Sequence, residues 1–345
     1  MVRIHETPAN RVVIGPGSLG WVTDEVERAG GTRVLLIASR SATAVADTVV
    51  GALGERVVMR FDRPAVHTPV EVTDEVMAEV GSDNVDAVVA IGGGSAIGLS
   101  KAVSARSGVP QVVVPTTYAG SEVTPVLGET RDGVKTTRRD VTLLPGTVVY
   151  DPELTLSLPA GLTLTSSLNA VAHSVEALWA PDATAVSDAL ATESVQRILG
   201  ALPLVLSDLR DIEARRRLQT GAWLAGLCLA QTQMGLHHQL AHALGGTFDL
   251  PHAELHALLL AHVMRFNLPH TPGVAARLSR VVSGDPVVVV EDFARSHHGA
   301  TTLRELGVPH DRMIAIADRV IASPYPNPRP IERGPLVDLL DSAWG

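Results

Sequence analysis

Short apolar runs alternate with helix-like segments along the first half of the chain. Four of these runs, each bounded by polar residues, predict fully buried strands at 33–38, 56–61, 86–91 and 111–115. Apolar positions at helical spacing predict helices between them, at 44–53 and 71–80. Strands that alternate with helices of this length are typical of a parallel sheet covered on both faces.

From about Leu158 onward, helical periodicity replaces the β-branched runs. We expect Ser166 or Ser167 to cap one helix, and the spacing predicts further helices at 185–206, 213–230, 233–244 and 253–266. One run, 287–290, is ambiguous, because its pattern fits a strand as well as a helix. The predicted fold is therefore an α/β domain with a parallel, Rossmann-like sheet (1–159), followed by an all-α domain (160–345), with a cleft between the two.

Composition and charge narrow the class of protein. Aromatic residues make up 3% of the chain, so Ala, Val and Leu must build most of the core. The net charge is −9 without a block of like charges, which argues against binding to nucleic acid or an anionic membrane. There is no apolar run at the N-terminus and no stretch of eighteen apolar residues, and Cys228 is the single cysteine. We expect a cytoplasmic protein without disulfides that acts on a small molecule.

A glycine-rich segment, 92–101, follows the predicted strand 86–91. Glycines at a strand-to-helix turn let the backbone approach a ligand, and the free N–H groups of a helix start bind phosphate. Gly93, Gly94 and Ser95 are therefore candidates to hold a pyrophosphate, although Gly98 falls one position too late for the usual dinucleotide motif. The alternative is a purely structural tight turn. A second polar loop, 115–122, follows the next strand and should converge on the same crevice.

Ser39 and Arg40 stand at the end of the predicted strand 33–38, where no acidic residue is found. A carboxylate there would bind a ribose 2′-hydroxyl and repel a 2′-phosphate. Its absence, with Arg40 alongside, predicts that NADPH is accepted as well as NADH. Arg40 as an ordinary solvated residue is the alternative.

Four of the thirteen histidines lie within the segment 235–252. His238 and His242 are four residues apart, so they share one face of a helix, which we expect to end at Gly245-Gly246. His252 opens the next segment, within plausible reach of the same pocket. One or two of these histidines could instead be core or turn residues with satisfied hydrogen bonds.

Together these segments resemble the iron-containing alcohol dehydrogenase superfamily and, within it, the maleylacetate reductases. The resemblance covers nearly the whole chain and rests on the motifs at 67–73, 92–101, 115–124, 135–137, 149–152, 169–173, 235–252 and 325–330. Gly98-Leu99, Tyr118 and Asn169 indicate the maleylacetate reductases in particular. The resemblance implies a dehydroquinate synthase-like fold, a homodimer, and a place in the catabolism of aromatic compounds.

In the superfamily an aspartate and three histidines bind iron or zinc, and those positions correspond to Asn169, His173, His238 and His252. The neutral amide of Asn169 is a poor ligand for a divalent cation. Maleylacetate reductases share this asparagine and look metal-independent. We therefore expect no catalytic metal; if iron or zinc is bound, these four residues would hold it.

The resemblance implies an NAD(P)H-dependent reductase of maleylacetate, giving 3-oxoadipate, or of a related unsaturated oxo acid. His242 would transfer the proton, and His238, His173 and His252 would hold or polarise the oxo and carboxylate groups. Asn169 would face the cleft beside His173. The nicotinamide half would be held by Thr116, Thr117 and Lys135, and the remaining pocket candidates are Tyr118, His67 and Tyr325.

Two segments depart from the reductase pattern. The chain has Gln239-Leu-Ala-His242 where Lys-Leu-Cys-His is expected, and Leu260-Ala-His262 where Leu-Pro-His is expected. Loss of the lysine removes a cation that would meet a substrate carboxylate. A metal-dependent alcohol dehydrogenase or ketone reductase of a biosynthetic pathway therefore stays open. So does a different class, a lyase or a cofactor-binding protein without catalysis.

Overall fold

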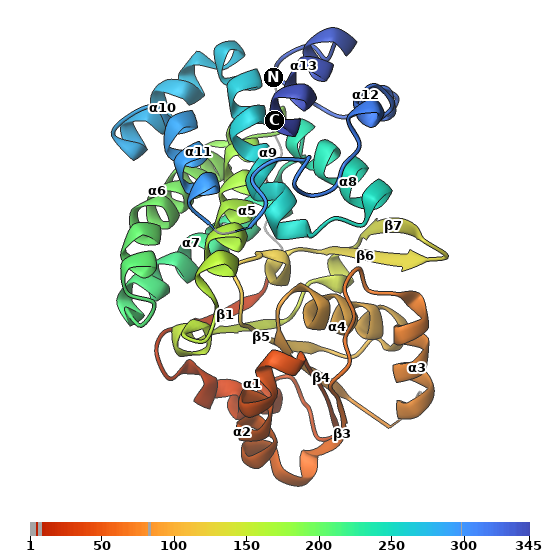
Figure 1. Cartoon of the computed structure of the whole chain (residues 1–345). Coiled ribbons are helices and arrows are strands. Elements are labelled where there is room, and N and C mark those ends of the chain that lie inside the picture. Colours follow the sequence, from red (N-terminus) through yellow and green to blue (C-terminus); the bar gives the residue numbers. More distant parts are fainter. Residues whose placement is uncertain (1–4, 6–8, 82–83, 298) are drawn as a thin grey trace. The chain divides into compact units, whose positions relative to one another are not determined.

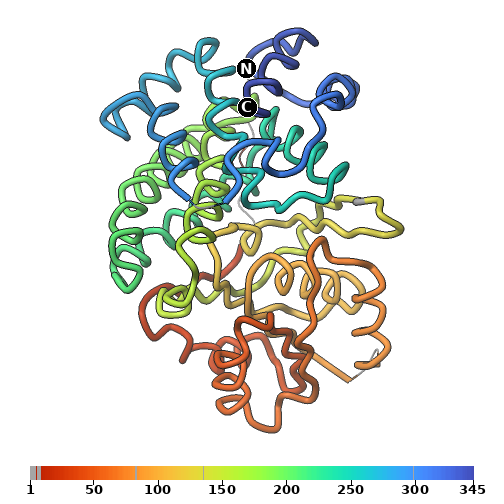
Figure 2. Tube along the Cα trace, in the orientation of Figure 1, coloured from red at the N-terminus to blue at the C-terminus, as the bar shows by residue number. Residues whose placement is uncertain are grey.

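The computed structural model describes residues 5, 9–81, 84–297 and 299–345. The chain forms two compact units (Figure 1), and each is described by itself. The sheet unit contains Thr7–Leu158 and Arg210–Gln219, and the helical unit contains Pro159–Leu209 and Thr220–Gly345. The trace in Figure 2 passes from strands into a long succession of helices near residue 160.

Six parallel strands form the main sheet, in the order β1-β8-β5-β4-β2-β3. Their bounds are β1 Arg11–Ile14, β2 Val34–Ala38, β3 Val57–Phe61, β4 Ala87–Gly92, β5 Gln111–Pro115 and β8 Thr147–Tyr150. The four predicted strands are thus confirmed as β2 to β5, and the predicted α/β class with a parallel sheet is confirmed too. The prediction of full burial is wrong for β3, which lies at the edge of the sheet and has one fully buried residue, Phe61. β1 and β8 were not predicted, because each has only four residues and no long apolar run.

Helices cover both faces of this sheet. α1 (Val22–Arg28) and α2 (Thr43–Leu53) pack on one face, where Val26, Ala46 and Val49 join a core with strand residues. α3 (Val70–Val80) and α4 (Gly94–Ser107) pack on the other. Both strand faces are therefore apolar, which is why the central strands read as continuous hydrophobic runs.

An antiparallel hairpin, β6 (Val126–Arg131) and β7 (Val134–Arg139), was not predicted. Its turn residues Asp132 and Gly133 have φ angles of 50° and 74°. An Asp-Gly pair with two positive φ angles is the preferred two-residue hairpin turn, so the sequence did contain a signal for it.

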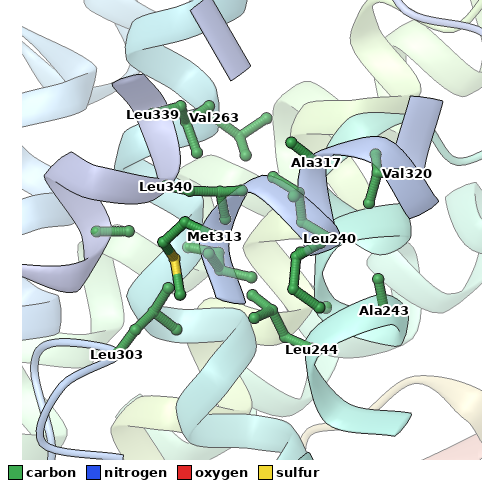
Figure 3. Packing of buried hydrophobic residues seen from close by; sticks show 14 of the residues in the cluster. Leu240, Ala243, Leu244, Val263, Leu303, Met313, Ala317, Val320, Leu339 and Leu340 are labelled. Carbon is green, nitrogen blue, oxygen red and sulfur yellow. The ribbon is translucent and has the colours of Figure 1, made fainter. Parts of the chain in front are cut away.

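The helical unit is built from long helices packed on one another. They are α5 Ala160–Leu178, α6 Ala185–Ser207, the later part of α7 Ile212–Gln231, α8 Leu236–Phe248, α9 His252–Asn267, α10 Pro272–Val282, α11 Pro286–Ser296, α12 Met313–Ile321 and α13 Arg333–Trp344. Figure 3 shows Leu240 and Leu244 of α8 packed among residues of α9, α12 and α13. This core holds in place the helices that carry most of the predicted histidines.

Three local predictions need correction or completion. Neither Ser166 nor Ser167 caps a helix: α5 begins at Ala160, and the Ser166 hydroxyl donates to the Leu162 carbonyl at 2.6 Å within it. The predicted stop at Gly245-Gly246 is wrong, because α8 continues to Phe248 and ends at Asp249, whose φ is 52°. The ambiguous run 287–290 is helical and lies in α11, whose first turn the Asp285 carboxylate caps.

Among the described residues, one helix is long and apolar enough to cross a membrane by length and composition alone, which the sequence analysis did not expect. This helix is α6, with a mean hydropathy of 1.2. Its buried face, including Ala191 and Ile198, packs within the helical unit, and Asp188 forms an ion pair with Arg277 of α10 at 3.0 Å. A buried core helix passes the same test, so α6 is weak evidence for a span.

Candidate functional site

Three loops at the carboxyl edge of the sheet come together around Gly92 and Gly93. The Ser39 N–H donates to the Ile91 carbonyl, and the Thr116 N–H donates to the Gly92 carbonyl, both at 3.0 Å. A Cβ atom on Gly92 would lie 2.4 Å from the Ser39 Oγ, and one on Gly93 would lie 3.0 Å from the Thr117 side chain. The ends of β2, β4 and β5 are therefore in direct contact, and only glycine fits between them.

The start of α4 offers unoccupied backbone donors. Its N-cap residue is Gly93, no side chain caps the first turn, and no acidic residue lies there. A Cβ atom on Gly94 would meet nothing within 4 Å, so this position faces open space. Gly94 is exposed and Ser95 is half-buried. A helix start with free N–H groups and open space in front of it suits a phosphate.

The other residues predicted on this unit lie in varied settings. Arg40 is exposed, whereas the Ser39 Oγ is buried and has no hydrogen-bond partner among the described residues. The Tyr118 ring is fully buried, and its hydroxyl donates to the Thr155 Oγ1 at 3.0 Å and accepts from Arg215 at 3.2 Å. Tyr118 thus ties its loop to α7. The backbone of Lys135 pairs in β7, but its side chain lies outside the described residues.

His67 stands in a left-handed stretch of backbone. Its φ is 62° and that of Thr68 is 47°, conformations that residues other than glycine rarely adopt. The hairpin strand β6 holds this stretch, because the Thr130 Oγ1 donates to the His67 carbonyl at 3.1 Å and the Thr130 N–H donates to the Thr68 carbonyl at 3.2 Å. The His67 side chain is half-buried.

In the helical unit, one face of α5 carries Asn169, His173 and Glu176. The spacing of four and then three residues places the three side chains in a row. All three are buried, with 4%, 4% and 0% of their surface exposed. The Asn169 Oδ1 and the His173 Nδ1 have no hydrogen-bond partner among the described residues.

The histidines of α8 and α9 lie beside this face and form a continuous cluster. Ring centroids are 5.0 Å apart between His173 and His238, 5.0 Å between His238 and His256, and 4.1 Å between His256 and His252. The His242 ring lies 6.2 Å from that of His238. His242 and His252 are exposed, whereas His238 and His256 are buried. The structure therefore brings the four predicted histidines into one cluster, linked through His256.

Sequence reasoning gave no role to His237, whose ring lies 4.9 Å from that of His256, and it missed two further members of this cluster, each of which had a signal. His256 follows His252 by four residues, the same spacing as His238 and His242. Glu176 is the only acidic residue between 160 and 178, and it lies on the face that carries Asn169 and His173. An acidic residue inside an otherwise apolar helix needs a partner, which makes it a candidate for the site.

Burial sets the protonation of the cluster. It lowers the pKa values of His173, His237, His238 and His256, and the neighbouring imidazoles lower those of His173, His238 and His256 further. Burial also raises the pKa of Glu176, although His237 and the backbone N–H groups around it act in the opposite direction. These four imidazoles are therefore neutral at pH 7.

The side chains do not reproduce the superfamily's set of one carboxylate and three histidines. Asn169 brings no charge, and the Glu176 carboxylate already accepts from the N–H groups of Gly235 and His237 at 3.0 and 2.9 Å. Among the described residues, the imidazole nitrogens that converge belong to a different set, His237, His238 and His256, and lie within 4.8 Å of one another. Three imidazoles can hold iron or zinc, but this set lacks the superfamily's carboxylate and shares only His238 with the four positions that correspond to its metal ligands.

Tyr325 also borders the cluster. Its ring packs against the helical core, and its hydroxyl is buried without a hydrogen-bond partner among the described residues. Burial, together with the nearby Glu176, raises the pKa of Tyr325 to about 12. The hydroxyl is therefore protonated at neutral pH and able to donate.

Comparison with known proteins gives one consistent answer. The iron-containing alcohol dehydrogenase profile matches residues 9–152, and the C-terminal profile of the same family matches residues 163–344. Maleylacetate reductase 1 of Rhodococcus opacus is 47% identical over 97% of this chain and 94% of its own, and maleylacetate reductase of Sphingobium indicum is 43% identical over 99% and 97%. The crystal structure of maleylacetate reductase from Agrobacterium tumefaciens is 41% identical, covers 100% of this chain and 98% of its own, and has a TM-score of 0.95. The chain therefore belongs to the iron-containing alcohol dehydrogenase family and is an oxidoreductase.

Proposed function

We propose that the protein reduces maleylacetate, or a closely related unsaturated oxo acid, with NADH or NADPH. The observation that carries this proposal is Asn169: a neutral amide stands beside His173 where the superfamily has an anionic metal ligand. A dianionic substrate would be repelled by a carboxylate there, but an amide can donate hydrogen bonds to it. The full-length similarity to maleylacetate reductases agrees with this choice of substrate.

On this proposal the cofactor binds at the carboxyl edge of the sheet. Gly93, Gly94 and Ser95 at the start of α4 hold the pyrophosphate, and Arg40 accepts a 2′-phosphate when one is present. The nicotinamide half is held by Thr116, Thr117 and Lys135. Once bound, the reduced nicotinamide supplies the hydride.

The histidine cluster supplies the proton and the polar contacts. Reduction places the hydride on the carbon β to the ketone and a proton on the α carbon, giving 3-oxoadipate from maleylacetate. His242 is exposed at the end of the cluster and is the proposed proton donor. His173 and His252, with Asn169 and Tyr325, hold the substrate's oxo and carboxylate groups as negative charge develops on the oxygen. No step is assigned to a metal.

The decisive experiment follows NADH and NADPH oxidation with maleylacetate and with a panel of enals, enones and oxo acids. We expect maleylacetate to be the best substrate and 3-oxoadipate to be the product. His242→Ala should reduce kcat by at least about 100-fold. His270→Ala, at an exposed histidine outside the cluster, should leave kcat unchanged.

The same panel separates the alternatives. Oxidation of simple alcohols that requires added iron or zinc would indicate a metal-dependent alcohol dehydrogenase. Loss of the substrate without NAD(P)H oxidation would indicate a lyase. The protein is further proposed to work as a cytoplasmic homodimer, which light scattering of the purified protein and fractionation of cells would test.

A further inference from the structure

Glu176 is the most fully engaged polar side chain of the histidine cluster, and the proposed mechanism gives it no role. Its carboxylate accepts four hydrogen bonds, all from the segment that opens α8. Three come from the backbone N–H groups of Gly235, His237 and His238, at 3.0, 2.9 and 3.4 Å. The fourth joins the His238 Nδ1 and the Glu176 Oε2 at 2.6 Å.

The backbone contacts make Glu176 an N-cap supplied from another helix. α8 has Gly235 at its N-cap position and no side chain of its own that caps it. A buried anion at a helix start satisfies the free N–H groups and interacts favourably with the helix dipole. The contact also explains Gly235, because a Cβ atom there would lie 2.7 Å from the Pro326 carbonyl oxygen and 3.1 Å from the Glu176 Oε1.

The fourth contact determines which nitrogen of His238 carries the proton. Burial raises the pKa of Glu176, but three backbone N–H groups donate to its two oxygens and act against that shift, which favours the ionised carboxylate. An ionised carboxylate can only accept. The neutral His238 must then be protonated at Nδ1, which leaves a lone pair on Nε2. The Nε2 atom is buried and has no hydrogen-bond partner among the described residues.

We propose that Glu176 is a positioning residue that locks His238 in its Nδ1–H form, so that Nε2 serves the reaction as a hydrogen-bond acceptor. This inference rests on the proposed function and adds a role for His238, to which that mechanism assigns none. In this form His238 cannot donate to the substrate's oxo group, the role that sequence reasoning gave it. Its Nε2 instead accepts from a bound O–H group, such as that of a water molecule.

His237 shows the opposite arrangement, which makes the assignment specific. The His237 Nε2 lies 2.9 Å from the His256 carbonyl oxygen. A carbonyl can only accept, so His237 is protonated at Nε2 and its Nδ1 carries the lone pair. Two adjacent histidines of one helix are thus held in different tautomers, one by a carboxylate and the other by a carbonyl.

The direct test is 15N NMR of the full-length protein labelled at histidine, recorded with and without NADPH. The signal that is present in the wild type and absent from the His238→Gln variant is assigned to His238. We expect that resonance to report a protonated Nδ1 and an unprotonated Nε2. A His238 found protonated at Nε2, or at both nitrogens, at pH 7 would overturn the proposal, and this holds whether or not maleylacetate is the substrate.

The variant Glu176→Gln keeps the size of the side chain and removes its charge. We expect the His238 Nδ1–H signal to be lost in part and kcat to fall by about 10- to 100-fold. The dissociation constant for NADPH should stay within about twofold, because the proposed cofactor contacts lie in the other unit. Unchanged kcat with an altered tautomer would refute the role in the reaction.

Glu25→Gln is the matched control. Glu25 is also a buried carboxylate, 1% exposed, but it pairs with Arg11 and Arg28 of the sheet unit. Its loss should lower stability and leave both the His238 resonance and kcat unchanged. A fall of kcat in both variants would mean that losing any buried carboxylate is enough, and the positioning role would be wrong.

Discussion

A Cβ atom on Gly98 would lie 2.3 Å from the Oγ1 of Thr68, so the Thr68 hydroxyl fills the space that a side chain at position 98 would need. Gly98 lies on α4, and Thr68 is held with a φ of 47°. Gly98→Ala should therefore force Thr68 to move and lower the unfolding free energy by about 1–3 kcal/mol. Chemical denaturation measures this loss.

The double variant Gly98→Ala/Thr68→Gly should recover most of it, because glycine removes the hydroxyl and adopts a positive φ without strain. Gly51→Ala is the control: it also lies in a helix, and its Cβ would meet nothing within 4 Å. That substitution should leave stability unchanged or slightly higher. Equal effects of the two alanines would show that the contact with Thr68 is irrelevant.

Gly94→Val should abolish dinucleotide binding and leave the fold intact. The open space in front of Gly94 accommodates the valine in the free protein, but the side chain would occupy the place of the pyrophosphate. Calorimetry with NADPH and thermal unfolding measure the two effects. Gly273→Val is the control, since it also lies in the first turn of a helix, α10, and faces open space. Unchanged NADPH affinity in Gly94→Val would remove this loop from the cofactor site.

The sequence predicted the central strands well because their burial leaves a local mark. β2, β4 and β5 are covered on both faces, and every residue in them is apolar or buried. β1 and β8 have four residues each. β1 pairs with β8, and β8 also pairs with β5, and in both cases the partner strand lies more than 30 positions away in the chain. Such pairing is a tertiary property, and a four-residue run contains too little pattern to reveal it.

The residues of the candidate site also divide into those that a local pattern reveals and those that depend on tertiary contacts. Asn169, His173, His238 and His252 were predicted from motifs, because residue type and spacing are visible in the chain. Glu176 was missed because the three residues that bind it lie about 60 residues away, at the start of α8. The protonation of His238 depends on that contact, so it could not be predicted before the packing of α5 against α8 was known.

Arg40 should make NADPH a substrate at least as good as NADH. It is exposed at the end of β2, and no acidic residue stands at that strand end to repel a 2′-phosphate. Arg40→Ala should raise the KM for NADPH by about 10-fold, or about 1.4 kcal/mol, and leave the KM for NADH unchanged. Arg56→Ala, at a half-buried arginine that pairs with Glu27, should change neither. A wild-type preference for NADH of 100-fold or more would mean that this strand end does not face the 2′ position.

Lys101 should make stability depend on pH above neutrality. It is fully buried, donates to the carbonyls of Ser121, Thr124 and Val126, and has its pKa lowered to about 7 by burial, against the opposing influence of Glu122. In the unfolded chain a lysine has a pKa of about 10.4. At a pH between the folded and the unfolded pKa, the unfolded chain therefore binds more protons than the folded protein. The unfolding free energy then rises with pH, by up to about 1.4 kcal/mol per pH unit.

Denaturation of wild type and Lys101→Met from pH 7 to pH 8.5 tests this slope. The variant will be less stable throughout, since three carbonyls lose their donor, but it should lack the rise with pH. The range stops at 8.5 because burial raises the pKa of the Cys228 thiol to about 12, and that group lowers stability at higher pH. Parallel curves for the two proteins would show that Lys101 keeps its proton in both states.

Exhaustive chelation should leave the reductase fully active, and elemental analysis should find no stoichiometric iron or zinc. The four positions that would hold the superfamily's metal contain three imidazoles and one amide, and the nearby carboxylate of Glu176 is committed to α8. Asn169→Asp restores an anionic ligand, so it should raise the affinity for zinc and iron. It should also lower activity, because the new charge would stand beside the negative charge of the substrate. Asn267→Asp, in an amide pair with Asn327 outside the histidine cluster, should leave metal affinity unchanged. If chelation abolishes activity and one metal restores it, the proposed direct role of the histidines is wrong. The variants would then locate the metal: if His256→Phe loses it and His252→Phe keeps it, the ligands are His237, His238 and His256.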